Sequence, residues 1–198
     1  MHSRIPLLDD GWLHYEASFI PQSEADGLFE VLRSSTSWYQ EGSRGRLFPR
    51  LVAWCADPTV VYTYSGITHE SSPWTEELLQ IRQQIEQATE VLFNSVLLNY
   101  YRDGRDSMGF HADDEPELGQ NPVIASVSLG AARRFVLKHN RTGEKHEILL
   151  EHGSLLVMGG SCQHFWKHAI PKTAKPDGPR INLTFRHIHS KKPSTTKT

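Results

Sequence analysis

The sequence has little cysteine, no long apolar run and almost no net charge, and each of these shortages excludes a class of protein. Among its 198 residues only Cys55 and Cys162 are cysteines, too few for a disulfide framework, so we expect two free thiols in a reducing compartment. No stretch approaches the roughly 20 apolar residues that cross a bilayer, and the first ten residues lack the apolar core of a secretory signal. Neither export nor membrane spanning is predicted.

The formal net charge is −2, from 21 Lys and Arg against 23 Asp and Glu. A histone-like or polybasic membrane-binding protein is thereby excluded, and any contact with nucleic acid must come from a local patch. Apolar residues make up 38% and charged residues 22%, a balance typical of a folded chain. The length predicts a single domain, placed at residues 1–189, whereas the tail at 190–198 has no apolar anchor and is predicted to be disordered.

Two segments carry apolar residues at helical spacing. The first lies at about residues 23–34, where Ser23 and Asp26 resemble a capping box. The second follows Thr75 and has one apolar face that extends to Leu92. Both helices are expected to pack on a sheet.

From residue 95 onward the pattern changes to short runs rich in Val, Ile, Leu and Phe, separated by Gly, Pro, Asp and Asn turns. The runs are VLLNYY, PVIASVSL, RRFVLK, KHEILL, GSLLVMGG and RINLTFRHI. This antiparallel β pattern lacks the alternating helices of a Rossmann fold. The sequence therefore predicts a mainly β fold with flanking helices (α+β), in which a two-sheet jelly roll packs against N-terminal helices.

A candidate metal site begins with His111-Ala112-Asp113. Residues two apart on an extended strand point to the same face, so one imidazole and one carboxylate would converge. The best third ligand is His168, 55 residues after Asp113 and beside the apolar GSLLVMGG run. Two His and one carboxylate leave coordination positions open, as in non-haem Fe(II) oxygenases. Taken alone, an HxD pair is more often two solvated strand residues than a metal site.

His164 competes for the role of third ligand, because its i, i+4 spacing from His168 would suit Zn²⁺ on a helix. The segment follows a Gly-Gly pair, precedes a proline and lacks the Glu of zinc peptidases, so we expect His164 at the surface or beside the site. His139, His146 and His152 lie near predicted turns, where solvated side chains are expected.

Residues 180–186 alternate strictly, with Ile, Leu and Phe on one face and Arg, Asn, Thr and Arg on the other. The apolar face is predicted to be core. The polar face is either a solvated sheet edge or a grip on a dianion, because guanidinium groups pair bidentately with carboxylates. Asn99 and Tyr101 add an amide and a phenol by the same spacing.

Several motifs occur together in a fixed order from about Tyr62 to Arg186. They are Asn99-x-Tyr101-x-x-Gly104, His111-Ala112-Asp113-Asp114-Glu115, Ile124-Ala125-Ser126, the distal His168 and the RINLTFR segment. In this combination the chain resembles the AlkB family of Fe(II)- and 2-oxoglutarate-dependent dioxygenases. Its motifs look most similar to those of the branch that repairs alkylated nucleic acids.

The resemblance implies that His111, Asp113 and His168 are catalytic residues that bind iron inside a double-stranded β-helix. It assigns the 2-oxoglutarate pocket to Asn99, Tyr101, Arg180, Asn182, Thr184 and Arg186. The far carboxylate of 2-oxoglutarate would meet Arg180, and Arg186 would lie near the carboxylate at the metal. A buried dianion requires such cations and donors to offset its desolvation.

The implied reaction uses Fe(II), 2-oxoglutarate and dioxygen. N-methylated bases in DNA, such as 1-methyladenine and 3-methylcytosine, are dealkylated with release of formaldehyde, while 2-oxoglutarate is decarboxylated to succinate. The alternatives are demethylation or hydroxylation of RNA or protein at the same site, or a noncatalytic reader of methylated nucleic acid. We expect a cytoplasmic monomer, nucleoid-associated or nuclear when it acts on DNA.

Base recognition is expected from a hairpin or lid at residues 39–66. A base within a duplex must be flipped out and held between flat side chains, for which Tyr62 and Tyr64 are candidates, with the ring of His111 on the other side. The alternative for both tyrosines is that they are ordinary strand aromatics facing a core.

Asp114 and Glu115 would accept hydrogen bonds from an exocyclic amine and favour a cationic methylated base, or else are solvated loop acids. Arg50 resembles the family's basic residue at the base of the hairpin, so a strand contact is expected there. Other cations available for phosphates are Arg44, Arg46, Lys138, Arg141, Lys172 and Lys175. The hairpin tip is polar and only Leu47 and Phe48 could intrude into a duplex, so preference for duplex DNA is in doubt.

Overall fold

The fold was obtained as a computed structural model. It describes residues 4–43, 45–58, 60, 62–64, 67–69, 71–175 and 178–189, with only the backbone described at 62–64 and 67–69. Arg44 and the tail at 190–198, which was predicted to be disordered, lie outside the described residues.

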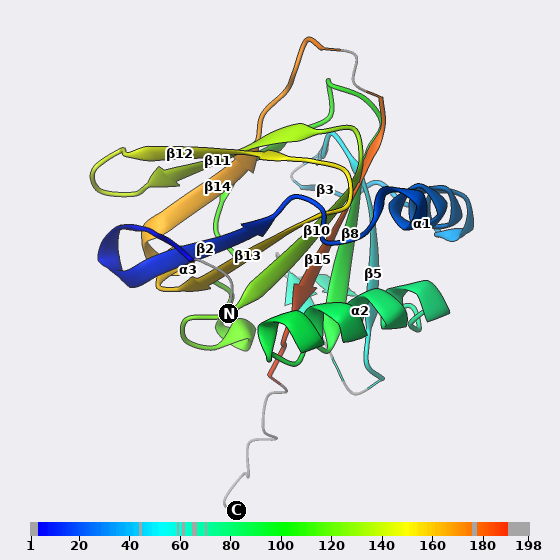
Figure 1. Cartoon of the computed structure of the whole chain (residues 1–198), viewed down its shortest axis with the longest axis horizontal. Coiled ribbons are helices and arrows are strands. Elements are labelled where there is room, and N and C mark those ends of the chain that lie inside the picture. The colour runs from blue at the N-terminus through cyan, green and yellow to red at the C-terminus, as the bar shows by residue number, and fades with distance from the viewer. Residues whose placement is uncertain are drawn as a thin grey trace, which may run out of the picture.

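A seven-stranded antiparallel sheet forms the larger layer of the molecule (Figure 1). In spatial order its strands are β1 (Ile5–Pro6), β2 (Gly11–Glu16), β13 (Ser154–Gly160), β10 (Ile124–Gly130), β15 (Arg180–Arg186), β8 (Ser95–Tyr101) and β5 (Leu51–Ala56). β15 pairs with β8 along its whole length, from Arg180 opposite Tyr101 to Arg186 opposite Ser95, and with β10 on its other side. The strictly alternating segment at 180–186 therefore lies in the interior of the sheet.

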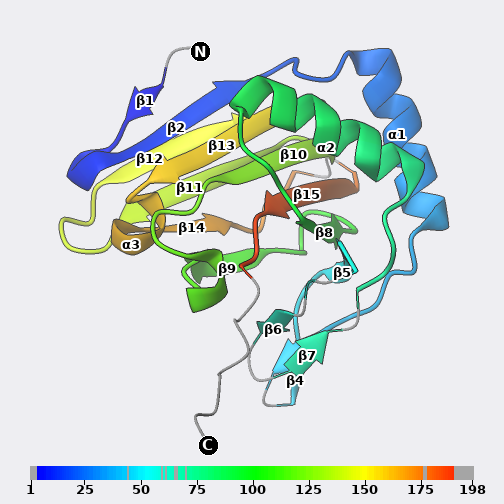
Figure 2. The ribbon, with the colours of Figure 1, turned by 90° about the horizontal axis from the view of Figure 1, so that it is seen from below.

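A four-stranded antiparallel sheet forms the second layer (Figure 2). Its strands are β12 (Lys145–Leu150), β11 (Arg133–His139), β14 (Trp166–Ile170) and β9 (Met108–His111). A buried cluster between the layers takes residues from both sheets, such as Leu156 and Ile124 from the larger and Phe135 and Trp166 from the smaller. The predicted jelly roll is confirmed.

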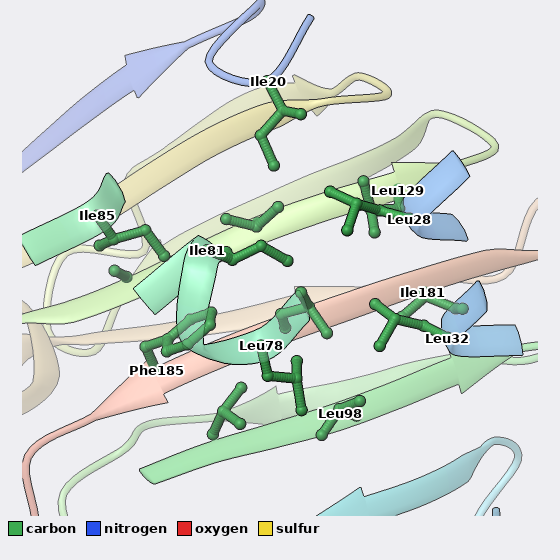
Figure 3. Packing of buried hydrophobic residues seen from close by; sticks show 14 of the residues in the cluster. Ile20, Leu28, Leu32, Leu78, Ile81, Ile85, Leu98, Leu129, Ile181 and Phe185 are labelled. Atoms are coloured by element: carbon green, nitrogen blue, oxygen red, sulfur yellow. The ribbon is translucent and has the colours of Figure 1, made fainter. Parts of the chain in front are cut away.

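Two helices cover the other face of the larger sheet (Figure 2). They are α1 (Gln22–Ser35) and α2 (Glu76–Thr89). Their apolar faces meet the outward side chains of β10, β15 and β8, as Figure 3 shows for Ile81 and Ile85 of α2 and for Leu28 and Leu32 of α1. The interior strands of the larger sheet are thus covered on both faces, which explains why β10, β13 and β15 are buried along almost their whole length.

The helix ends differ in detail from the prediction. Thr75 does cap α2, accepting a hydrogen bond from the Leu78 N–H at 3.4 Å. In α1 the N-cap is Pro21, so the capping box of Ser23 and Asp26 is not formed among the described residues. Leu92 lies past the end of α2 and is 69% exposed, so the apolar face of that helix is shorter than predicted.

Strands also occur before residue 95. For this part of the chain the sequence pattern predicted only a hairpin and a short strand-like run. β2 and β5 join the larger sheet, and two small hairpins lie between the helices. These are β3 (Gly42–Ser43) with β4 (Arg46–Leu47), and β6 (Tyr62–Tyr64) with β7 (Ile67–His69). The short helical turns are η1 (Leu8–Asp10), η2 (Pro116–Leu118) and α3 (Cys162–Phe165). No helix in the described part of the chain has the length and apolar character to span a membrane.

Truncation of Ile85 tests the packing of α2 on the sheet. Ile85 is fully buried, so Ile85→Ala removes apolar contacts and leaves a cavity, and we expect a loss of about 2–5 kcal/mol in the free energy of unfolding. Leu79 on the same helix is 46% exposed, and Leu79→Ala should change that free energy by no more than about 0.5 kcal/mol. Urea denaturation followed by circular dichroism measures both; equal effects would contradict the described packing.

Candidate functional site

A cavity of about 290 Å³ lies between the two sheets. Its walls come from β8 and β15 of the larger sheet and from β9 and β14 of the smaller one, together with the segment around Arg50. Apolar side chains, among them Trp54, Leu97, Phe135 and Met158, line one part of it. Polar side chains gather in the remainder, which is the pattern of a site for a small charged ligand.

Three side chains that could hold a metal ion meet in this cavity. The ligand atoms of His111, Asp113 and His168 all lie within 4.8 Å of one another, and the described residues contain no other such group of three. His168 in β14 lies opposite His111 in β9, with ring centroids 4.2 Å apart. Asp113 was expected on the same strand as His111, but β9 ends at His111 and Asp113 lies in the following loop.

Charge and burial together keep Asp113 and His168 in the protonation states that a metal ion needs. Burial would raise the pKa of Asp113, but the nearby Arg186, His168 and His111 outweigh it and lower that pKa to about 2. The charge of Arg186 is the largest of these lowering effects, and its Nη2 also donates to Asp113 Oδ1 at 2.7 Å. Burial, helped by the charge of His111, lowers the pKa of His168 to about 3. An ionised carboxylate and a neutral imidazole are both ready to bind a cation at neutral pH.

The histidine rings are also held from outside. His111 Nδ1 lies 3.0 Å from the carbonyl oxygen of Gly109, and Phe135 stacks on His168 with ring centroids 5.2 Å apart. Such contacts fix the orientation of a metal-binding imidazole. The backbone N–H of Asp113 donates to Gln163 Oε1 at 2.9 Å, a contact that the sequence analysis did not identify. No local pattern could have revealed it, because the two residues are 50 positions apart.

Arg180 forms a buried cationic end of the cavity. The side chain is 1% exposed, and its Nη2 donates to Ser128 Oγ at 2.8 Å. Among the described residues, Nε and Nη1 have no hydrogen-bond partner. Burial lowers the pKa of Arg180 to about 10, so the guanidinium stays charged at neutral pH. A buried cation with two unused donors strongly favours an anionic ligand in the cavity.

The other polar residues of this wall form a connected network. Asn182 Nδ2 donates to Ser126 Oγ at 2.7 Å, and Thr184 Oγ1 donates to Asn182 Oδ1 at 3.1 Å. On the neighbouring strand, Asn99 and Tyr101 are each 1% exposed, and Tyr101 lies 5.2 Å below the Arg180 guanidinium. All seven residues of β15 are buried, so the alternative of a solvated sheet edge is wrong.

The predicted substrate residues are less uniformly placed. Glu115 and Arg50 line the cavity, whereas Asp114 is exposed and is not among the described lining residues. Arg50 Nε donates to Asn99 Oδ1 at 2.8 Å, so it joins the hairpin segment to the polar wall. Tyr62 and Tyr64 lie in β6, but their side chains fall outside the described structure.

The remaining histidines separate clearly from the metal site. His164 is exposed at the end of the four-residue α3, and His168 lies in a strand, so the helical i, i+4 pair is not formed. His139 was predicted to be solvated and that is wrong: it is fully buried, with Nε2 2.8 Å from Asp9 Oδ2 and Nδ1 2.8 Å from Thr142 Oγ1. The partner Asp9 is 130 residues away, which is why the turn near His139 gave no sign of burial.

Comparison with known proteins identifies this architecture. The model of the 2OG-Fe(II) oxygenase superfamily matches residues 12–186. The chain is 38% identical over 182 residues to human "DNA oxidative demethylase ALKBH2", covering 84% of this chain and 70% of that protein. This chain belongs to the AlkB family of 2OG-Fe(II) oxygenases. It is also 42% identical over 185 residues to bovine "Alpha-ketoglutarate-dependent dioxygenase alkB homolog 3", covering 86% of this chain. The chain spans 64% of the length of that bovine relative.

Solved structures agree with this AlkB fold. The structure of OsALKBH1 superimposes with a TM-score of 0.64 at 18% identity, covering 88% of this chain and 97% of that one. A prolyl-4-hydroxylase from Pseudomonas putida gives a TM-score of 0.56 at 17% identity, covering 88% of this chain and 92% of that one. At these identities the likeness establishes the fold alone.

Membership of the AlkB family implies Fe(II), 2-oxoglutarate and dioxygen, and the cavity fits the first two. The two imidazoles and one carboxylate are the ligand set associated with non-haem Fe(II) and open coordination positions. The unused donors of Arg180 match a carboxylate at the other end of a dicarboxylate ligand.

Metal binding should depend on His168 and not on His164. Mn²⁺, a redox-inert substitute for Fe²⁺, should raise the thermal midpoint of the wild-type chain, because a ligand that binds only the folded state stabilises it. The rise should be lost in His168→Ala and retained in His164→Ala, as measured by differential scanning calorimetry with and without MnCl₂. Loss of the rise in His164→Ala would restore the alternative histidine pair.

Proposed function

We propose that this chain is an oxidative demethylase of N-methylated bases, of the 1-methyladenine and 3-methylcytosine type, in DNA. The observation that carries the proposal is the pairing of a two-His, one-carboxylate cluster with an unsatisfied buried Arg180 in one cavity. The names of its relatives, an alpha-ketoglutarate-dependent dioxygenase and a DNA oxidative demethylase, support the same reaction. When bound, Fe(II) and 2-oxoglutarate would supply oxidation of the methyl group by dioxygen, with formaldehyde, succinate and carbon dioxide as products.

In this proposal His111, Asp113 and His168 hold the metal, and six residues of β8 and β15 hold 2-oxoglutarate. The six are Asn99, Tyr101, Arg180, Asn182, Thr184 and Arg186. Arg180 binds the far carboxylate with its two unused donors. Arg186 holds Asp113 and lies next to the carboxylate at the metal end. The apolar lining excludes water from the reacting methyl group.

Base recognition is assigned to the mouth of the same cavity. Glu115 lines it, where a carboxylate would accept from the exocyclic amine of a cationic methylated base and favour it over the neutral parent. Asp114, exposed beside it, would contact the edge of the nucleotide. Tyr62 and Tyr64 are proposed to stack on the flipped base, and Arg50 to join the bound strand to the polar wall through Asn99.

The hairpin of β3 and β4 favours single-stranded substrates. Its described residues are exposed, and Leu47, 67% exposed, is the one large apolar side chain in its two strands. Opening a duplex costs a few kcal/mol per base, which apolar wedge residues normally offset. We propose that residues 1–189 act as one domain, with 39–66 as the recognition lid, in a monomer that works in the cytoplasm at nucleoid DNA or in the nucleus.

Mass spectrometry of a 1-methyladenine oligonucleotide tests the reaction. Incubation with Fe(II), ascorbate, oxygen and 2-oxoglutarate should remove the mass of one CH₂ unit, faster from the single strand than from the duplex. The loss should require 2-oxoglutarate and should disappear in Asp113→Ala and His111→Ala, but persist in His164→Ala. Consumption of 2-oxoglutarate without change in DNA would redirect the search to methylated RNA or peptide. Binding of the oligonucleotide without any consumption would indicate a reader.

Substitution of Arg180 tests the cosubstrate assignment. A lysine keeps the charge but loses the planar set of donors, so Arg180→Lys should raise the KM for 2-oxoglutarate by about tenfold or more, since a charge-assisted hydrogen bond contributes about 1.5–3 kcal/mol. Arg134, exposed on β11, provides the matched control, and Arg134→Lys should leave that KM unchanged. Succinate formation at varied 2-oxoglutarate measures both. An unchanged KM in Arg180→Lys would mean that the far carboxylate of 2-oxoglutarate binds a residue other than Arg180.

A further inference from the structure

The loop that carries Asp113 depends on a side chain from another part of the chain. β9 ends at His111, and its ladder with β14 already shifts register between His168 and Ile170. Asp113 therefore lies beyond the regular pairing, yet it is only 3% exposed. Its N–H donates to the side-chain oxygen of Gln163 at 2.9 Å. Because a buried N–H needs an acceptor, this contact decides where the backbone of Asp113 settles.

Gln163 is itself firmly held. It is 1% exposed, and its Nε2 donates to Met158 Sδ at 3.6 Å, which turns Oε1 toward the loop. It belongs to α3, whose first turn is closed by bonds from His164 N and Phe165 N to the carbonyl oxygen of Ser161. The acceptor is thus held by contacts of its own that do not involve Asp113.

Two contacts then determine the direction of the Asp113 carboxylate. Gln163 fixes its backbone, and Arg186 fixes Oδ1 at 2.7 Å. Oδ2 remains on the side of His168, 4.0 Å from its Nε2. His168 lies five residues after Gln163. The segment 163–168 therefore carries one of the three assigned ligands, His168, and also contacts the backbone of another, Asp113.

We propose that Gln163 is a positioning residue of the metal centre, acting on the Asp113 ligand through its backbone N–H. The proposal rests on the assignment of His111, Asp113 and His168 as metal ligands. Groups that orient metal ligands in this way typically change metal affinity by 10–100-fold when they are replaced.

The test compares variants that differ at this acceptor. Gln163→Met keeps the length of the side chain but removes the oxygen, and Gln163→Asn keeps an amide that is too short to reach. His164→Ala, on the exposed neighbour in α3, is the matched control. Calorimetric titration of the metal-free chains with MnCl₂ gives the Kd, and thermal unfolding without metal reports folding.

We expect Gln163→Met and Gln163→Asn to raise the Kd for Mn²⁺ by about 10–100-fold, with His164→Ala remaining close to the wild type. The visible absorption spectrum of the Co²⁺-loaded chain should change in the first two variants alone, because the carboxylate ligand is displaced. A merely structural role would lower the thermal midpoint of the metal-free variants and leave the Kd for Mn²⁺ unchanged; that result overturns the proposal. If the wild-type chain binds no Mn²⁺, both the metal-ligand assignment and the positioning role of Gln163 fail. If the chain binds Mn²⁺ with a Kd that the Gln163 substitutions leave unchanged, the positioning role alone fails.

Discussion

The ion pair between Arg186 and Asp113 ties the two sheets together at the point where the chemistry is proposed. Arg186 ends β15, an interior strand of the larger sheet, and Asp113 follows β9, the edge strand of the smaller one. Both side chains are almost completely buried, so neither charge has water to solvate it. Loss of one partner from such a pair typically costs about 3–5 kcal/mol, because the other is left as an uncompensated buried charge. The same contact thus joins the two sheets and favours the ionised form of the carboxylate.

β15 is buried on both faces, although one face is apolar and the other is polar. Its Ile, Leu and Phe side chains pack under the two helices, while Arg180, Asn182, Thr184 and Arg186 face the cavity. The polar half is buried as thoroughly as the apolar half. Ser126 and Ser128 on β10 accept from Asn182 and Arg180, respectively, which satisfies part of that polar surface. The cavity side of the strand is consequently a buried polar surface rather than a solvated edge, as the proposed anion site requires.

Sequence patterns predicted those features of the molecule that depend on residues close together in the chain. The strict alternation at 180–186 separated the core face from the polar face, and the spacing of His111, Asp113 and His168 nominated three residues whose donor atoms lie within 4.8 Å. The strands β2 and β5 were missed, because they gain their stability by pairing with β13 and β8, which lie far away in the sequence. For the same reason, neither the burial of His139 by Asp9 nor the contact of Gln163 with Asp113 could be read from neighbouring residues. The helix predicted at about residues 23–34 runs from Gln22 to Ser35, and its N-cap is Pro21 rather than a residue of the predicted capping box.

Binding of 2-oxoglutarate to the unused donors of Arg180, as proposed, would also link the concentration of this ligand to the stability of the fold. Without an anion, the folded chain carries a desolvated cation whose hydrogen-bonding capacity is only partly met. A ligand that completes it and binds only the folded state adds RT ln(1 + [L]/Kd) to stability, about 2.7 kcal/mol at one hundred times its Kd. The fraction of chain that is unfolded, and so open to proteolysis, would fall by about one hundredfold over that range. Cellular 2-oxoglutarate would then govern how much of this protein persists as well as how fast it turns over.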